Sequence, residues 1–173
     1  MKDQHKDFGE VSFIIDEIKY NIKSNKINLS SEAETRLKII DRIIREICQW
    51  EYNQISVEEK DGYDGSKFID YVLRSRDNLV VIQAKKNGIV FPTPSKQKKL
   101  KITGSILSSG EINKAIQQVE FYAESKDAQL IVVTNGECWC FFRPINYRVP
   151  NDEYATLLFP LESIVDCEKL FNI

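Results

Sequence analysis

Three polar residues stand in segments that are otherwise apolar. Asp70 interrupts the run FIDYVL (68–73), and Gln83 and Lys85 lie near the end of the run LVVIQAK (79–85). Burying a charged lysine is costly unless an anion lies beside it. If the two runs pair as a hairpin, an aspartate, an amide and a lysine converge at one end of a sheet.

Such a set of groups suits phosphodiester hydrolysis. A carboxylate holds Mg²⁺, which prefers oxygen ligands, and the metal polarises the phosphate and activates water. A lysine orients that water and stabilises charge developing on the phosphorane. The spacing alone leaves a second interpretation open, in which Asp70 and Lys85 form a buried ion pair and Gln83 is hydrogen-bonded nearby.

The elements that position these residues are predicted from apolar periodicity. Helical spacing of apolar residues covers 10–24, and a second helix runs from Ser31 to about Cys48, capped by Ser30 or Ser31 with Glu34 in the position of a capping box. Residues 87–110 are expected to form a loop. Strands are expected at 54–59, 68–73, 79–85, 130–135 and 138–142, turns at 61–65 and 75–78, and further helices at 111–126 and 160–171.

Strand alternation over 79–85 places Gln83 and Lys85 on one face and Val80, Ile82 and Ala84 on the other. The strand is almost wholly apolar, which is typical of the centre of a sheet. The order of elements, α-α-β-β-β-α-β-β-α, predicts a single α/β domain with a central mixed sheet flanked by helices.

The composition excludes several classes of site. The chain of 173 residues has one histidine, His5, so histidine-based triads and most catalytic zinc sites are not expected. Its four cysteines contain no C-x-x-C pair, and we expect reduced thiols. The net charge of −2 argues against a general polycation. A polar N-terminus and the lack of a long apolar run predict a cytoplasmic protein without a membrane partner.

The run from Ser31 to Lys86 resembles the N-terminal nuclease domain of type I restriction-enzyme R subunits, in the PD-(D/E)xK superfamily. The matching segments are SEAETRLKIIDRIIREICQW, FIDYVL and LVVIQAKK, and the later TNGECWCFF resembles the family's strand-turn-strand. The resemblance covers about residues 31–143 and implies a restriction-endonuclease-like fold. Residues 1–173 then form one nuclease-like domain, with an N-terminal helix in 1–30 and a C-terminal extension in 144–173.

The resemblance implies roles for residues of a catalytic site. Asp70 matches the metal-binding aspartate and Lys85 the family lysine, while Glu34 matches a helix glutamate that assists the metal or water, with Glu32 as the alternative. Gln83 stands where the family usually has glutamate, which removes one negative charge. Mrr-like type IV restriction enzymes resemble this sequence in carrying Q-x-K. Asp70 and Gln83 are thus the expected ligands of Mg²⁺, with Mn²⁺ as a substitute.

Two further features are expected to contact DNA. Gln118 and Tyr122 match the Q-h-x-x-Y helix motif that supports the site in RecB-like nucleases, and ordinary helix packing is the alternative. Residues 83–114 hold seven lysines and one acidic residue, Glu111, and a lysine-rich loop beside a metal site suits the phosphate backbone unless it is merely solvated. The lysines expected to bind DNA are Lys86, Lys96, Lys98, Lys99 and Lys101.

The sequence leaves three functions open. The first is a Mg²⁺-dependent DNA endonuclease in a restriction or anti-phage defence system, acting with a motor, sensor or methyltransferase-specificity partner or as a homodimer. The second is a non-catalytic nucleic-acid-binding module with a degenerate nuclease site, which the substitution at Gln83 favours. The third is a structural or interaction domain in which Asp70 and Lys85 are a buried ion pair.

Overall fold

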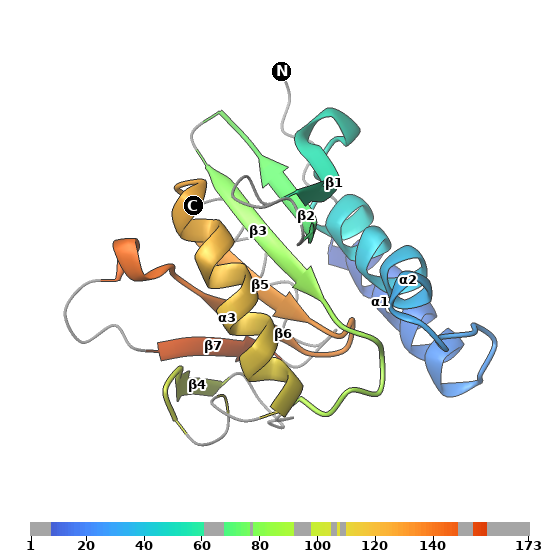
Figure 1. The fold of residues 1–173 in the computed structure, drawn as a ribbon. Coiled ribbons are helices and arrows are strands. Elements are labelled where there is room, and N and C mark those ends of the chain that lie inside the picture. The colour runs from blue at the N-terminus through green and yellow to red at the C-terminus, as the bar shows by residue number, and fades with distance from the viewer. Residues whose placement is uncertain are drawn as a thin grey trace.

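The computed structural model of the chain describes residues 8–60, 68–76, 78–91, 98–104, 107, 110–148 and 154–158. Its centre is a seven-stranded sheet in the order β1-β2-β3-β5-β6-β7-β4 (Figure 1). Strands β3 and β5 are parallel, and every other neighbouring pair is antiparallel. The prediction of an α/β fold with a central mixed sheet is therefore confirmed.

The bounds of most elements agree with the sequence patterns to within a few residues. Helix α2 continues into two π-helical turns, η1 and η2, which together form the second predicted helix. The helices are α1 (Phe8–Lys23), α2 (Glu32–Thr35), η1 (Arg36–Ile40), η2 (Ile43–Ile47), α3 (Gly110–Ser125) and the short 3₁₀ turns η3 (Tyr52–Gln54) and η4 (Ile145–Tyr147). The strands are β1 (Ile55–Lys60), β2 (Phe68–Arg74), β3 (Leu79–Ala84), β4 (Lys98–Lys101), β5 (Leu130–Thr134), β6 (Trp139–Phe142) and β7 (Tyr154–Leu158).

Two strands, β4 and β7, were not expected. Strand β4 lies inside the segment 87–110, which the sequence predicted to be a loop, and β7 lies in the C-terminal extension. The four residues of β4, KKLK, include one apolar side chain, so they show no alternation that would signal a strand. They form a strand because they pair with β7 along their length. The predicted turn at 61–65 and helix at 160–171 lie outside the described residues.

Helices cover both faces of the sheet (Figure 1). Helices α1, η1 and η2 pack on one face through an isoleucine-rich cluster, and α3 packs on the other. The buried positions of α3 include Ile112, Ile116 and Val119, which recur at helical spacing and so form one apolar stripe. Within the described ranges, no helix combines the length and apolar character that crossing a membrane requires.

The β5–β6 turn fixes the helix that carries much of the candidate site. Gly136 has a φ of +86°, which a residue with a Cβ rarely adopts. A Cβ there would also lie 3.1 Å from Ile39 Cγ2 and 3.2 Å from Thr35 Cγ2. Glycine suits both this backbone conformation and this close approach, so the β5–β6 turn packs directly against the start of the second helix.

Candidate active site

Asp70 lies where β2 separates from β3. The ladder between the two strands ends at the pair of Tyr71 and Ile82. Beyond it, Asp70 Oδ2 accepts a hydrogen bond from the backbone nitrogen of Ala84 at 2.7 Å and another from the Gln83 side-chain amide. The carboxylate thus replaces a backbone acceptor, which explains how an aspartate is accommodated inside an apolar strand.

The neighbouring strand β1 is irregular at the same level. Val57 pairs with Tyr71, and Glu59 pairs with Ile69. In a regular strand these two pairs would lie on the same face of the sheet. Here they lie on opposite faces. The reversal occurs at Glu58, whose φ is +52°. A non-glycine residue in this conformation costs about 1–3 kcal/mol and is common at functional sites. Strand β1 therefore carries backbone strain opposite Asp70.

Gln83 is buried beside Asp70. As the sequence predicted, Val80, Ile82 and Ala84 belong to the cluster on the opposite face of β3. The side chain of Gln83 is 4% exposed, and its amide nitrogen donates to Asp70. Its carbonyl oxygen, Oε1, is buried and has no hydrogen-bond partner in the part of the chain that the structure describes. Leaving a buried acceptor unsatisfied costs about 1–3 kcal/mol, so this oxygen is an acceptor suited to a ligand.

Arg36 is the cation that contacts Asp70. Its Nη1 lies 3.2 Å from Asp70 Oδ1 and 3.0 Å from Glu58 Oε1, so one guanidinium is shared by two carboxylates. The guanidinium also lies 5.0 Å from the centre of the Tyr71 ring. The Tyr71 hydroxyl donates to Asp41 at 2.7 Å, which holds the ring in place beneath Arg36.

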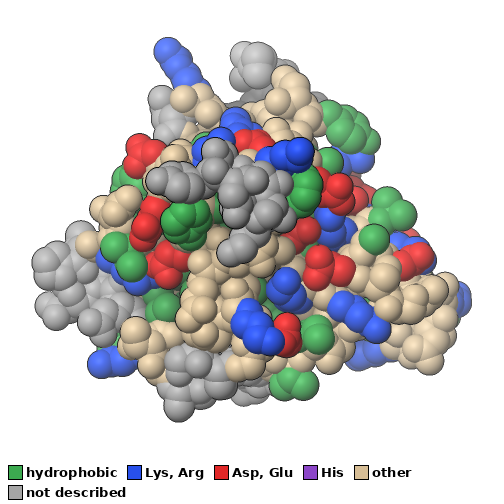
Figure 2. All heavy atoms as spheres, viewed as in Figure 1, with side chains coloured by type: hydrophobic (Ala, Val, Ile, Leu, Met, Phe, Trp, Pro, Cys, Tyr) green, Lys and Arg blue, Asp and Glu red, His purple; other side chains and the backbone are tan. Residues whose placement is uncertain are grey.

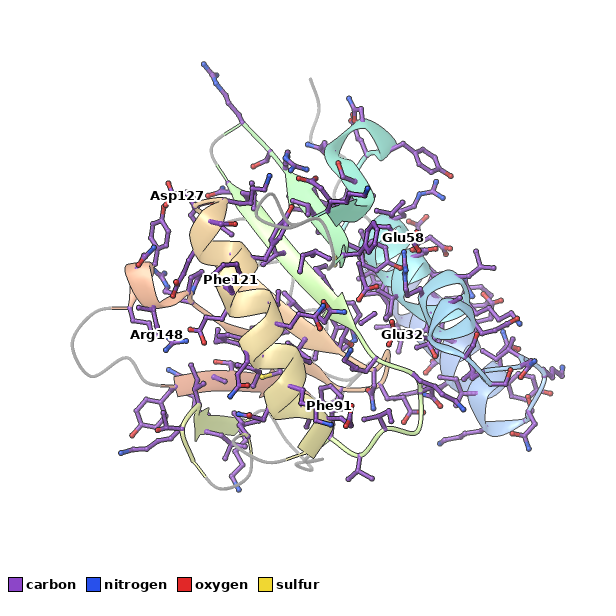
Figure 3. All side chains as sticks on the ribbon, viewed as in Figure 1. Glu32, Glu58, Phe91, Phe121, Asp127 and Arg148 are labelled. Carbon is purple, nitrogen blue, oxygen red and sulfur yellow. The ribbon has the colours of Figure 1, made fainter. Side chains whose placement is uncertain are left out.

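Sequence reasoning did not single out Arg36 or Glu58. A signal for Arg36 was available, because it lies four residues after Glu32 and therefore on the same side of the helix. Glu58 had no such signal, since its approach to Arg36 depends on the irregular backbone of β1. Figure 3 shows the labelled side chains of Glu32 and Glu58 between the N-terminal helices and the strands of the sheet.

Lys85 pairs with a different acid. Its ammonium lies 3.9 Å from Glu32 Oε2, and its backbone nitrogen continues the parallel pairing by donating to Thr134 O at 2.7 Å. Asp70 forms its ion pair with Arg36. The Asp70–Lys85 ion pair considered from the sequence is therefore wrong as a direct contact, because each residue has a nearer partner of opposite charge.

The two glutamates at the start of the second helix take different positions. Ser31 caps the helix by accepting the Glu34 backbone N–H at 3.1 Å, which confirms one of the two predicted caps. The carboxylate of Glu34 pairs with Lys38 one turn along the helix. Glu32, named as the alternative to Glu34, instead reaches Lys85 and acts electrostatically on Asp70. Glu32 is thus the helix glutamate nearest the group around Asp70.

The environment of Asp70 disfavours its charge. Burial is the main reason that its pKa rises to about 6, and the negative charge of Glu32 adds to this effect. The hydrogen bond from Ala84 and the positive charges of Arg36 and Lys85 oppose the rise. A buried carboxylate whose pKa is raised in this way would gain from a further cation, because a cation favours its charged form.

The residues expected on α3 face the sheet. Gln118 Nε2 lies 3.4 Å from Phe68 O, close to the start of β2. Tyr122 is 1% exposed, and its hydroxyl donates to Glu59 at 2.8 Å. Glu59 also accepts two hydrogen bonds from Arg74. Tyr122 therefore joins α3 to β1, and DNA would reach its hydroxyl only if this arrangement opened.

The lysines expected to bind DNA are dispersed. Lys86 is exposed just after β3, which lies inside the sheet. Lys98, Lys99 and Lys101 are exposed on β4, the edge strand farthest from β1. Four strand spacings separate β3 from β4, or roughly 20 Å, so the lysines of β4 do not lie beside Asp70 as expected. Lys96 lies outside the described residues. On the face seen in Figure 2, acidic and basic side chains are intermixed.

The residues around Asp70 offer a metal ion few protein ligands. In the described ranges, no three histidine, cysteine, aspartate or glutamate side chains are grouped as metal ligands. The protein oxygens that could serve as ligands are those of the Asp70 carboxylate, which also contact Arg36, Gln83 and Ala84, and the Oε1 of Gln83, which has no partner among the described residues. Mg²⁺ binds proteins through one or two carboxylates and keeps several waters. These residues therefore fit Mg²⁺ and do not form a closed cage.

Comparison with known proteins gives a partial structural match. No protein-family model and no curated protein matches the chain. A solved fragment described as an HsdR subunit of a type I restriction enzyme from Vibrio vulnificus has 21% sequence identity and a TM-score of 0.46. The match covers 80% of this chain and 25% of that chain, so the present chain corresponds to about a quarter of its length. The likeness concerns the fold alone.

Proposed function

We propose that this chain is a Mg²⁺-dependent nuclease domain that hydrolyses phosphodiester bonds in DNA. The observation that carries the proposal is the contact between Asp70 and Gln83. It places a buried carboxylate beside a buried amide whose oxygen has no hydrogen-bond partner among the described residues. Lys85 follows two residues later on the same strand end, where its charge acts on Asp70.

Each residue has a role that follows from its chemistry. Asp70 and Gln83 Oε1 would hold Mg²⁺, with the amide of Gln83 turning its oxygen toward the cation. Bound Mg²⁺ supplies a charge that polarises a phosphate and lowers the pKa of water. Lys85 is positioned by Glu32 and would stabilise negative charge on the phosphate. We assign to Glu32 the supporting role that the sequence resemblance gave to Glu34.

The biological setting follows from the sequence resemblance of residues 31–143. We propose that the domain acts in a restriction or anti-phage system together with a motor, sensor or specificity partner. The exposed lysines Lys86, Lys98, Lys99 and Lys101 would contact the DNA backbone, which needs no base-specific contacts.

The proposal is tested by cleavage with the Asp70→Ala variant. We expect the wild-type chain to nick plasmid DNA with Mg²⁺ and to lose this activity when EDTA is added. Asp70→Ala should remove the activity while circular dichroism remains that of a folded protein. Asp16→Ala, at an exposed position of α1, is the matched control. Wild-type nicking by Asp70→Ala would contradict the assignment of Asp70 as metal ligand.

A second candidate function is a nucleic-acid-binding module without catalysis. Gln83 favours this second function, because the amide supplies no negative charge to a metal and its nitrogen already donates a hydrogen bond to Asp70. Gln83→Glu separates the two candidates. The added carboxylate attracts Mg²⁺, while its desolvation and its repulsion with Asp70 cancel much of that attraction, so we expect affinity to rise by roughly fivefold.

The measurement is isothermal titration with Mg²⁺ and Mn²⁺, with exposed Gln117→Glu as the control. Cleavage at low Mg²⁺ should increase together with the affinity. If Gln83→Glu and the wild type bind the cation equally, residue 83 does not face a metal. DNA binding without Mg²⁺ binding in either protein would favour the non-catalytic module.

A further inference from the structure

Arg36 occupies one oxygen of the Asp70 carboxylate. Its guanidinium lies 3.2 Å from Asp70 Oδ1 and 3.0 Å from Glu58 Oε1. The Arg36 and Asp70 side chains are 16% and 9% exposed, whereas that of Glu58 is 66% exposed. One cation therefore joins a buried carboxylate to an exposed one.

We propose that Arg36 is a built-in competitor of the divalent cation at Asp70, and that Glu58 retains Arg36 when the cation binds. This inference rests on the proposed metal-dependent function. Like charges in a poorly solvated site repel, so a divalent cation bound by Asp70 disfavours the Arg36 contact. Glu58 offers the guanidinium a second carboxylate on the solvent side. Arg36 can therefore leave Asp70 and still keep a partner of opposite charge.

The surrounding structure supports an exchange between two positions. The Tyr71 ring, held by Asp41, provides a fixed surface over which the guanidinium lies. Arg36 is also the first residue of the π-helical turn η1, a distortion often found at functional sites. The strained backbone of Glu58 faces the same contact. Two backbone irregularities and one fixed aromatic surface thus meet at Arg36.

The test titrates the full chain with Mg²⁺. Calorimetry gives the dissociation constant, and the melting temperature is measured with and without Mg²⁺. Arg36→Gln removes the competitor, so the dissociation constant for Mg²⁺ should fall by roughly tenfold. Because Arg36→Gln also leaves Asp70 without its counter-ion, Mg²⁺ should raise the melting temperature of this variant more than that of the wild type. Glu58→Gln removes the group that retains Arg36, so the dissociation constant should rise by about two- to fivefold.

The double variant separates exchange from simple charge effects. In the Arg36→Gln background no guanidinium needs a partner, so adding Glu58→Gln should change Mg²⁺ affinity by less than about twofold. Arg42, on the same helix as Arg36, provides a matched control, because it also joins two glutamates, Glu17 of α1 and Glu46 of η2. Arg42→Gln and Glu17→Gln should leave Mg²⁺ affinity unchanged.

The outcomes distinguish this inference from the proposed function. If the wild type binds Mg²⁺ and Arg36→Gln binds it equally or more weakly, Arg36 is not a competitor and the inference fails while the function stands. The inference also fails if the effects of Arg36→Gln and Glu58→Gln on Mg²⁺ affinity simply add in the double variant. If Arg36→Gln does not fold, Glu58→Gln decides alone, and unchanged affinity overturns the inference. Absence of Mg²⁺ binding in every protein overturns the proposed function, and the inference with it.

Discussion

At the scale of single residues, burial determines the behaviour of Asp70. The Asp70 side chain is 9% exposed, and its carboxyl group keeps a raised pKa of about 6 although Arg36 and Lys85 lie nearby. Charge on Asp70 is therefore a net cost to the fold in the absence of a further cation. Such a cost is tolerated at functional sites, where chemistry rather than stability selects the residue.

This cost predicts a specific dependence of stability on pH. The pKa of Asp70 is about 6 in the folded state and about 4 in the unfolded state. The folded state therefore keeps Asp70 protonated up to a higher pH. The contribution of Asp70 to stability therefore falls as the pH rises from about 4 to about 6. At pH 7, Asp70→Asn should be more stable than the wild type by on the order of 2 kcal/mol.

The measurement is urea unfolding of both proteins at several pH values, with exposed Asp16→Asn as the control. The difference between wild type and Asp70→Asn isolates this group from the other carboxylates. It should shrink below pH 5, and Mg²⁺ should reduce it at pH 7 by stabilising the charged aspartate. A variant that is less stable than the wild type at pH 7 would show that the contacts of Asp70 outweigh its burial.

At the scale of elements, α3 is joined to β1 by a hydrogen-bonded acid. Glu59 accepts from Tyr122 and Arg74, and Lys126 lies 3.6 Å away. Burial raises the pKa of Glu59, but the hydrogen bonds from Arg74 and Tyr122 outweigh it, so the pKa is lowered overall. This network accounts for Tyr122 through packing, independently of any contact with DNA.

Removal of one hydroxyl tests that explanation. Tyr122→Phe should lower the stability by about 0.5–1.5 kcal/mol at pH 7, because Glu59 loses one donor and keeps Arg74. A lowered pKa contributes stability above the unfolded value, which is lost as the pH falls, so the effect should be smaller near pH 3. Thermal unfolding measures this change, with exposed Phe121→Leu as the control. A loss of DNA affinity without a loss of stability would support the role expected from the Q-h-x-x-Y motif.

At the scale of the whole molecule, the fold places the lysines of segment 83–114 in separate regions. The segment 83–114 is basic in sequence, but Lys85 pairs with Glu32, and Lys114 pairs with Glu111. The lysines of β4 lie at an edge of the sheet. Charged side chains there also protect an edge strand from pairing with other chains. DNA binding and edge protection make different predictions for these lysines.

The salt dependence of DNA binding distinguishes the two roles. If Lys98, Lys99 and Lys101 contact phosphates, changing all three to alanine should reduce the slope of log affinity against log salt by roughly 0.9 for each lost contact. Fluorescence anisotropy with a labelled duplex at several salt concentrations measures the slope, and Lys23→Ala with Lys26→Ala is the control. An unchanged slope, especially with increased aggregation, would assign the lysines to edge protection.

The sequence by itself determined the features that depend on near neighbours in the chain. Helical spacing located α1, the second helix and α3, and strand alternation placed Gln83 opposite the apolar residues of β3. The polar interruption at Asp70 marked the candidate site. These predictions succeeded because side-chain direction in a helix or strand follows from local geometry.

The tertiary structure alone decided which charges meet. Asp70 contacts Arg36, and Lys85 contacts Glu32, because the second helix packs against the ends of β2 and β3. The reversal at Glu58 and the distant position of β4 likewise depend on strand pairing between remote segments. A short sequence pattern carries no information about such pairing, since the energy of an ion pair depends on the distance and burial that the whole fold imposes.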